Sequence, residues 1–129
     1  MRTLATLFSA VLLVLMASGM AQAQYVMDVG QIRVALMKGE LGESEKLHQA
    51  TAFYVAKLTN IAGTRGSKSL DAIIARRQRH IFYMRNIVRQ NREAMRVLEI
   101  NHATLEQVIL FATSSRTVMM YVDDRQEAQ

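Results

Sequence analysis

The amino-acid sequence predicts an all-α fold, a small bundle of three or four helices organised on one long helix at about residues 69–99. The whole chain lacks proline, the usual breaker of helices, and the long segment lacks glycine as well. Apolar residues recur along it at helical spacing, which predicts one buried face. About thirty residues at ~1.5 Å each give a rod of roughly 45 Å. We therefore expect the other helices to pack along this rod, or two copies of it to pair.

The first 23 residues have the composition of a secretory signal peptide. A basic residue precedes an apolar run at residues 4–16, and small residues stand before the expected cleavage position at Ala23. The alternative is a retained membrane anchor, but the thirteen residues of this run are fewer than the roughly twenty that a spanning helix needs. We predict cleavage after Ala23, export to the bacterial periplasm, and one mature helical domain at residues 24–129 with a polar C-terminal tail.

The absence of cysteine limits both the chemistry and the stability of this chain. It excludes a disulfide framework, a thiolate nucleophile, a metal site built on cysteine and a lipid anchor on cysteine. Removal of the first 23 of 129 residues would leave 106, which is near the lower end for a domain with one core. Stability must therefore come from helix packing alone, or from packing together with oligomerisation.

Three further helices are expected around the long one. Residues 24–38 place apolar residues on one face before a stop at Gly39, with an extended arm as the alternative because several of them are β-branched. Residues 44–61 begin at a capping serine and carry a second apolar stripe. Residues 104–122 begin with capping-box spacing and have a very wide apolar face. The glycine-containing segment 63–69 is the expected linker before the long helix.

No set of residues in the sequence has the spacing of a catalytic or metal site. The three histidines lie on different segments, without a carboxylate at ligand spacing. The adjacent Ser114 and Ser115 lack the glycines of a nucleophile elbow, and we interpret Asp123 and Asp124 as solubilising charges in the polar tail. We therefore predict that the chain is not an enzyme and holds no metal or cofactor.

Basic charge is concentrated in the long predicted helix and the linker before it. The chain carries a formal net charge of +5, and residues 65–96 contain nine basic side chains against two acidic ones. Four arginines recur at spacings of four, three and four residues, which places them on one helical stripe with a phenylalanine at its end. A solvated arginine face without a binding role is the alternative. The predicted partner surface consists of Phe82, Arg85, Arg89, Arg92 and Arg96.

The apolar side of the same helix is a candidate seam for self-association. Its β-branched residues are compatible with two-stranded pairing, and one asparagine interrupts the apolar series. Such an asparagine can fix the register of paired helices, whereas in a monomer it would cap a neighbouring helix or hold a water. A homodimer, including one that exchanges segments through the 63–69 linker, is therefore an alternative to the monomer. The predicted seam consists of Ile74, Ile81, Met84, Val88, Asn91 and Met95.

These observations favour a small exported helical interaction protein, such as an assembly accessory, adaptor or chaperone of an envelope, secretion or conjugation system. Its partner would be a protein with an acidic surface, and an anionic component of the envelope is the alternative partner. Nucleic acid fits a basic stripe, but export argues against it unless the protein meets DNA during transfer or uptake. The alternative functions are a periplasmic metal or small-molecule stress sensor and an inhibitor or immunity-type binding protein.

Overall fold

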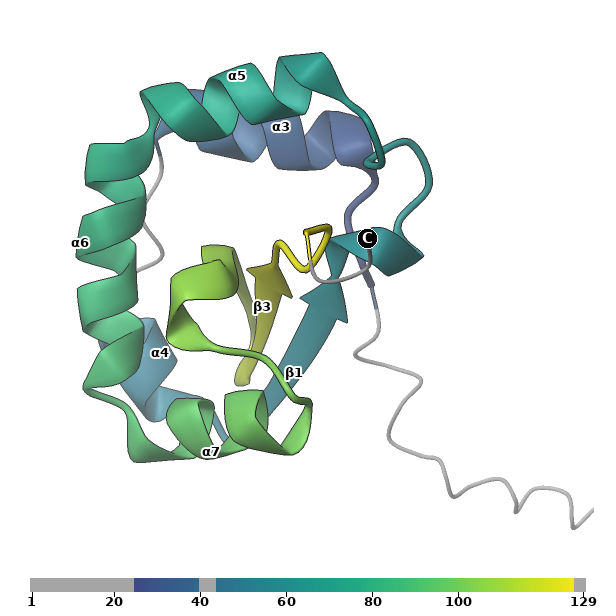
Figure 1. Cartoon of the computed structure of the whole chain (residues 1–129). Coiled ribbons are helices and arrows are strands. Elements are labelled where there is room, and N and C mark those ends of the chain that lie inside the picture. The colour runs from purple at the N-terminus through teal and green to yellow at the C-terminus, as the bar shows by residue number, and fades with distance from the viewer. Residues whose placement is uncertain (1–24, 40–43, 127–129) are drawn as a thin grey trace, which may run out of the picture.

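A three-stranded sheet lies inside a frame of helices, so the prediction of an all-α helical bundle is wrong (Figure 1). The computed structural model describes residues 25–39 and 44–126, and the predicted signal peptide lies outside them. The described residues form the α-helices α3 (Val29–Lys38), α4 (Ser44–Gln49), α5 (Lys68–Arg76), α6 (Gln78–Arg89) and α7 (Arg92–Ile100). They also form the strands β1 (Ala52–Lys57), β2 (Val108–Ser114) and β3 (Thr117–Val122) and the 3-10 helices η1 (Leu58–Asn60) and η2 (Leu105–Gln107). The chain is therefore an α/β protein.

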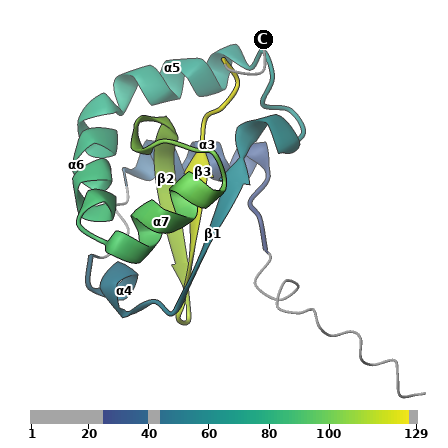
Figure 2. The same ribbon diagram turned by 60° about the horizontal axis from the view of Figure 1, so that its bottom comes forward.

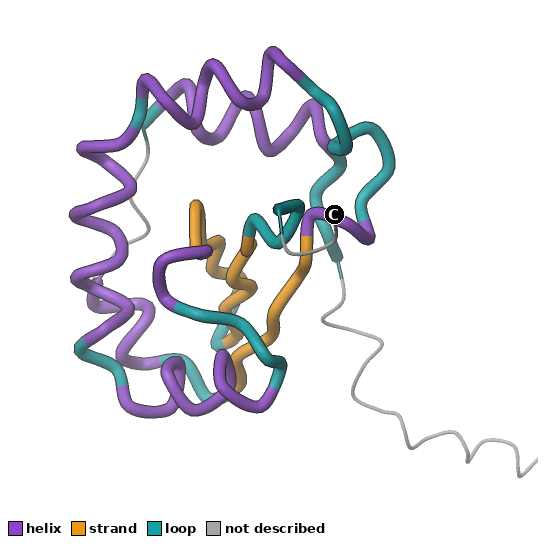
Figure 3. The backbone as a smooth tube through the Cα atoms, in the orientation of Figure 1, coloured by secondary structure: helices purple, strands orange, loops and turns teal. Residues whose placement is uncertain are grey.

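The sheet is mixed and has the strand order β1-β3-β2, with the helices around it (Figure 3). β1 runs parallel to β3, and Phe53 is the partner of Val118 in that pairing. β2 and β3 form an antiparallel hairpin in which Leu110 lies opposite Tyr121. Val118 and Met120 of the central strand are fully buried. The strand that comes last in the sequence is therefore the centre of the sheet and of its core.

The segment predicted as the last helix, residues 104–122, instead forms η2 and the hairpin of β2 and β3. Its many β-branched and aromatic residues favour strands, and its wide apolar face reflects strands that are buried on both sides. Ser115 and Arg116 make the turn, and Ser115 has a positive φ of 55°. Because glycine or asparagine usually occupies such positions, the sequence lacks the signal that marks a hairpin.

The predicted helix at residues 44–61 is also wrong beyond its first turns. α4 begins at Ser44 as expected but ends at Gln49, and β1 follows. Phe53, Tyr54 and Val55 are three consecutive strand-forming residues in its centre. All six residues of β1 have partners on β3. This pairing with a distant segment, which local periodicity does not reveal, decides between helix and strand here.

The predicted long helix at residues 69–99 is three helices joined at two corners (Figure 1). α5 begins slightly earlier than predicted, because the Oγ of Ser67 caps it by accepting from the N–H of Leu70 at 3.2 Å. The corners fall at Arg77 and at Asn91. α6 then packs on β2 and α7 packs on β1 (Figure 2). Since β1 and β2 are the opposite edges of the sheet, a straight rod could not contact both in this way.

Asn91 makes the second corner without glycine or proline. Its backbone is extended, with φ −106° and ψ 112°, and its Oδ1 accepts from the N–H of Ala94 at 2.9 Å. Its Nδ2 lies 3.2 Å from the Nδ1 of His48 on α4. This member of the predicted seam is therefore the N-cap of α7.

Replacing this cap should destabilise the protein. We expect Asn91→Ala to lower the free energy of unfolding by about 1 kcal/mol, because the first turn of α7 loses its side-chain acceptor. Asn91→Asp keeps an oxygen in the same place and should retain most of the stability. Urea unfolding of both variants measures the difference. An unchanged or higher free energy of unfolding in Asn91→Ala would contradict the capping role.

The prediction of a first helix that stops at Gly39 is confirmed for residues 29–38. Gly39 has a φ of 65°, and a side chain there would collide with the guanidinium of Arg77. The Nε of Arg77 donates to the carbonyl of Leu36 at 2.8 Å, and its Nη2 donates to the carbonyl of Met37 at 2.6 Å. Arg77, at the first corner of the helical frame, therefore supplies hydrogen-bond donors to carbonyl groups at the end of α3.

A buried tyrosine attaches the residues before α3 to the central strand. The Oη of Tyr121 accepts from the N–H of Met27 at 2.9 Å, and the side chain is almost fully buried. Burial raises the pKa of Tyr121, against the opposing effect of the hydrogen bond from Met27. The contact holds the start of the described chain on the sheet.

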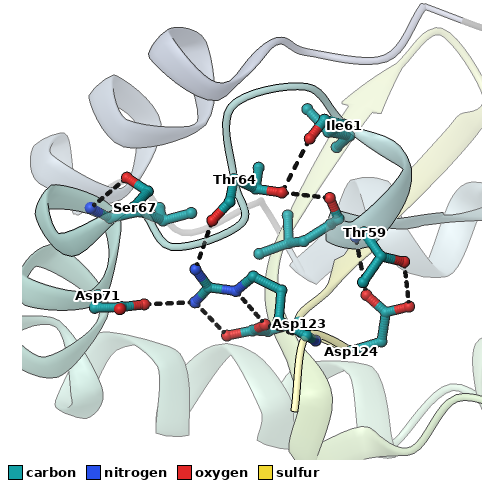
Figure 4. A network of polar contacts seen from close by, with 10 residues as sticks. Thr59, Ile61, Thr64, Ser67, Asp71, Asp123 and Asp124 are labelled. Atoms are coloured by element: carbon teal, nitrogen blue, oxygen red, sulfur yellow. Dashed lines mark hydrogen bonds and ion pairs between the residues drawn. The ribbon is translucent and has the colours of Figure 1, made fainter. Parts of the chain in front are cut away.

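The residues after β3, predicted as a polar tail, are tied to the segment before α5 (Figure 4). Arg125 is the centre of this arrangement. Its guanidinium donates to both carboxylate oxygens of Asp123 at 2.7 and 2.8 Å, to Asp71 at 2.7 Å and to the carbonyl of Thr64 at 2.9 Å. Asp123 and Asp124 therefore have structural roles, and the interpretation of both as solubilising charges is corrected.

A second set of contacts completes the arrangement. Asp124 accepts from the N–H of Thr59 at 3.0 Å and from its Oγ1 at 2.7 Å. Thr64 is fully buried and donates to the carbonyls of Leu58 and Ile61, so the predicted linker is a fixed turn (Figure 4). We call this set the C-terminal clamp; its members are Thr59, Thr64, Asp71, Asp123, Asp124 and Arg125.

Candidate functional site

An open hollow of about 860 Å³ lies where the end of α6, the outer face of α7 and the returning segment 102–106 meet. Three arginines line it, and three almost fully buried apolar residues form its floor. We call this hollow the arginine groove. Its lining residues are Arg89, Arg92, Met95, Arg96, Leu98, Glu99, His102, Ala103, Thr104, Leu105 and Glu106.

One face of α7 supplies most of the charged lining. Arg92, Arg96 and Glu99 follow at i, i+4 and i+7, so they share one side of the helix. The other side buries Ala94 and Leu98, and α7 packs there on β1. The charged side chains are therefore carried by a helix that the sheet holds in place.

The structure brings three of the four predicted stripe arginines to this groove. Arg89 stands in the last turn of α6, while Arg92 and Arg96 stand on α7 beyond the corner. They lie on two helices rather than on one continuous stripe. The corner at Asn91 nevertheless keeps them together, because it joins the end of α6 directly to the start of α7.

The three arginines differ in how they are held. Arg96 makes a two-pronged ion pair with Glu93, with its Nε 3.0 Å and its Nη2 2.5 Å from the two carboxylate oxygens. This hydrogen bonding lowers the pKa of Glu93 and raises the pKa of Arg96. Arg89 donates to the Oδ1 of Asn86. Within the described residues Arg92 has no hydrogen bond or ion pair through its side chain, so its guanidinium is available to a ligand.

Arg85, the fourth arginine of the predicted surface, turns toward the sheet instead of into the groove. Its Nε donates to the carbonyl of Val108, the first residue of β2, at 2.8 Å. Burial lowers the pKa of Arg85, and the nearby charge of Glu106 opposes this effect. The structure thus places Arg85 as a link between α6 and β2.

Phe82 lies outside the groove on the same side of α6 as Arg89, two turns away. Its side chain is 59% exposed, and it makes an edge-to-face contact with Tyr83 at 6.0 Å between ring centroids. This exposed aromatic pair gives α6 an apolar surface beyond the groove that a larger partner could cover.

The acidic and apolar lining of the groove was not among the residues predicted from the sequence. Glu99 could have been predicted from the sequence, because it follows Arg92 by two helical turns and therefore lies on the same face. Leu105 and Glu106 could not have been predicted in this way, because they come from the segment that returns past α7 after the predicted long helix. Only the observed corner and return path bring them opposite the arginines.

The predicted self-association seam is occupied within the chain itself. Ile81, Met84 and Val88 are buried in the core on the side of α6 that packs on β2. Ile74 and Met95 are half-buried against the same core. A dimer through these residues would require the helices to leave the sheet.

Other chemistry is sparse in the described part of the chain. No group of three or more histidine, aspartate or glutamate side chains there has the arrangement of a metal site. No helix there is long and apolar enough to cross a membrane. The described residues thus form an α/β fold with an open groove lined by three arginines.

Comparison of the chain with protein-family models, with curated proteins and with solved structures gives no match.

Proposed function

We propose that this chain is an exported interaction protein, such as an assembly accessory, adaptor or chaperone of an envelope, secretion or conjugation system. We propose further that its arginine groove binds an acidic segment of a partner protein. The convergence of Arg89, Arg92 and Arg96 on one open groove is the observation that supports this proposal. Export is supported by the sequence of residues 1–23. The mass of the protein in a periplasmic extract tests it, and a full-length membrane-bound species would contradict it.

The chemistry of the groove suits carboxylates. A planar guanidinium can hold both oxygens of one carboxylate, and it loses its hydration more readily than a lysine ammonium. Hydrogen bonds to charged groups contribute about 1.5 to 3 kcal/mol each when they are well made. The half-buried Met95, beside a floor of Leu98, Ala103 and Leu105, adds apolar surface for a side chain next to the carboxylates. A protein segment offers both kinds of group, whereas a simple anion offers one.

A double charge reversal tests this role directly. We expect Arg89→Glu with Arg92→Glu to weaken binding of an acidic partner segment about a hundredfold or more, because two attractive contacts become repulsive. Both side chains are exposed, so the midpoint of thermal unfolding should change little. Fluorescence anisotropy with a labelled acidic peptide measures binding, and the affinity should fall as salt is raised from about 0.05 to 0.5 M.

The matched control is Arg76→Glu with Arg79→Glu, which makes the same change in net charge at exposed positions outside the groove. The control should bind nearly as well as the unmodified protein. Equal loss in both variants would show non-specific attraction to a basic protein. Unfolding of the groove variant at a much lower temperature would show that the arginines support the fold. Binding to vesicles with anionic lipids, but not to the peptide, would assign the groove to a membrane surface.

A further inference from the structure

The charges of the arginine groove are separated along its length. Arg89 and Arg92 lie at the corner where α7 begins, and Glu99 lies near the other end of the helix. Within the described residues the Glu99 carboxylate makes no ion pair. The dipole of α7 has the same direction, positive near Arg92 and negative near Glu99. One end of the groove therefore attracts anions and the other attracts cations.

The spacing of these two ends sets the length of the segment that would fit. From Arg92 to Glu99 the axis of α7 rises by about 10 Å. An extended peptide rises by about 3.3 Å per residue and turns alternate side chains to one face, so the fourth residue beyond an anchored carboxylate shares its face. That residue lies about 13 Å along the groove, from where a lysine side chain can reach back to Glu99. The half-buried Met95 lines the groove between its two ends and offers apolar surface to the intervening side chains, beside the buried Leu98 and Leu105.

Two other charged groups act on this arrangement. Glu106, on the returning segment, lies near Arg85 and adds negative potential to the wall opposite α7. Arg96 stands midway along the groove but is already paired with Glu93. A second carboxylate placed in the middle of the groove would meet both a neutralised arginine and a nearby glutamate. The middle therefore favours an apolar residue over another acidic one.

From this complementarity we infer that the groove recognises a partner segment of mixed charge, with carboxylates at the corner, an apolar residue over the floor and a basic residue against Glu99. This inference rests on the proposed function and makes it more specific. It identifies the partner as a protein with an acidic-apolar-basic segment. A uniformly acidic surface would fit less well.

Three labelled peptides test the inference by anisotropy with the purified protein: Glu-Asp-Leu-Ala-Lys, Glu-Asp-Leu-Ala-Gln and Glu-Asp-Leu-Ala-Glu. We expect the lysine peptide to bind about threefold more tightly than the glutamine peptide and about tenfold more tightly than the glutamate peptide. Glu99→Lys should reverse this order, while Glu99→Gln should remove the preference for lysine over glutamine. Glu45→Lys makes the same charge change at an exposed position on α4, outside the groove, and should leave the order unchanged.

The outcomes separate this inference from the proposed function. If the three peptides bind equally well and Glu99→Lys has no effect, while Arg89→Glu with Arg92→Glu still abolishes binding, the mixed-charge inference is overturned and the acidic-segment proposal stands. If Glu45→Lys changes the order as Glu99→Lys does, the preference reflects net charge and the inference is also overturned. If none of the peptides binds above an uncharged peptide, both are overturned.

Discussion

Truncation of Met120 to alanine is expected to lower the free energy of unfolding by about 2 to 5 kcal/mol. Met120 is fully buried in the central strand, with Val55 of β1 and Phe111 of β2 as its neighbours in register. Removing its side chain would leave a cavity bounded by three strands, which the sheet cannot easily close. Urea unfolding followed by circular dichroism measures this loss.

Met119 is the matched control for this variant. It is the adjacent methionine on the opposite face of the sheet and is only half-buried. We expect Met119→Ala to cost less than half as much as Met120→Ala, because less apolar surface is lost. In the overturned helical prediction Met119 belonged to the wide apolar face and Met120 did not. Equal losses in the two variants would therefore contradict the strand alternation seen in β3.

Removal of the Arg125 side chain is expected to destabilise the protein by about 2 to 3 kcal/mol. The side chain is only 13% exposed, and its loss leaves the Asp123 carboxylate and the Thr64 carbonyl without their donor. Arg65→Ala changes the same residue type at an exposed position in the adjacent linker. This control should stay within about 0.5 kcal/mol of the unmodified protein. Equal effects of the two variants would show that the C-terminal clamp contributes little.

The contribution of the clamp should also depend on pH. Burial of Asp123 raises the pKa of its carboxyl group, but the hydrogen bonds and charge of Arg125 outweigh burial, so the net shift is downward. A carboxyl whose pKa is lower in the folded state adds stability above its unfolded pKa of about 4 and loses it as the pH falls. The difference between the unmodified protein and Arg125→Ala should therefore be full at neutral pH and shrink below about pH 4. A difference that stays constant down to about pH 2 would contradict this linkage.

Local signals predicted the elements whose ends are set by local contacts. α3 stops at Gly39 because its left-handed backbone ends the helix, and α4 begins at Ser44, within one residue of the predicted start. The strands have no such local determinant. Ala52 of β1 pairs with Thr117 of β3, far along the chain, and this pairing decides the structure of both segments. A single sequence carries no record of that contact, so helical periodicity was the stronger signal.

The candidate site shows the same division between local and distant determinants. The arginine spacing was visible in the sequence, and three of the four arginines do reach one groove. Arg85 does not reach the groove, because its side chain donates a hydrogen bond to the carbonyl of Val108, which lies beside α6. In the sequence Asn91 interrupts the apolar series, and this interruption fits two alternatives. It could set the register of two paired helices, or it could cap a helix or hold a water in a monomer. The corner that it makes, and the segment that returns past it, could be placed only once the sheet was known.

The order of the strands along the chain has a consequence for how the protein reaches its folded state. Of the strands in the described residues, β3 comes last in the sequence, and it is the partner of both β1 and β2. Before residues 117–122 are available, neither earlier strand has its neighbour in the sheet. The parallel pairing of β1 with β3 also closes a long loop, which slows folding. Formation of the sheet must therefore wait until residues 117–122 have been synthesised, and until then the apolar faces of β1 and β2 lack their central partner.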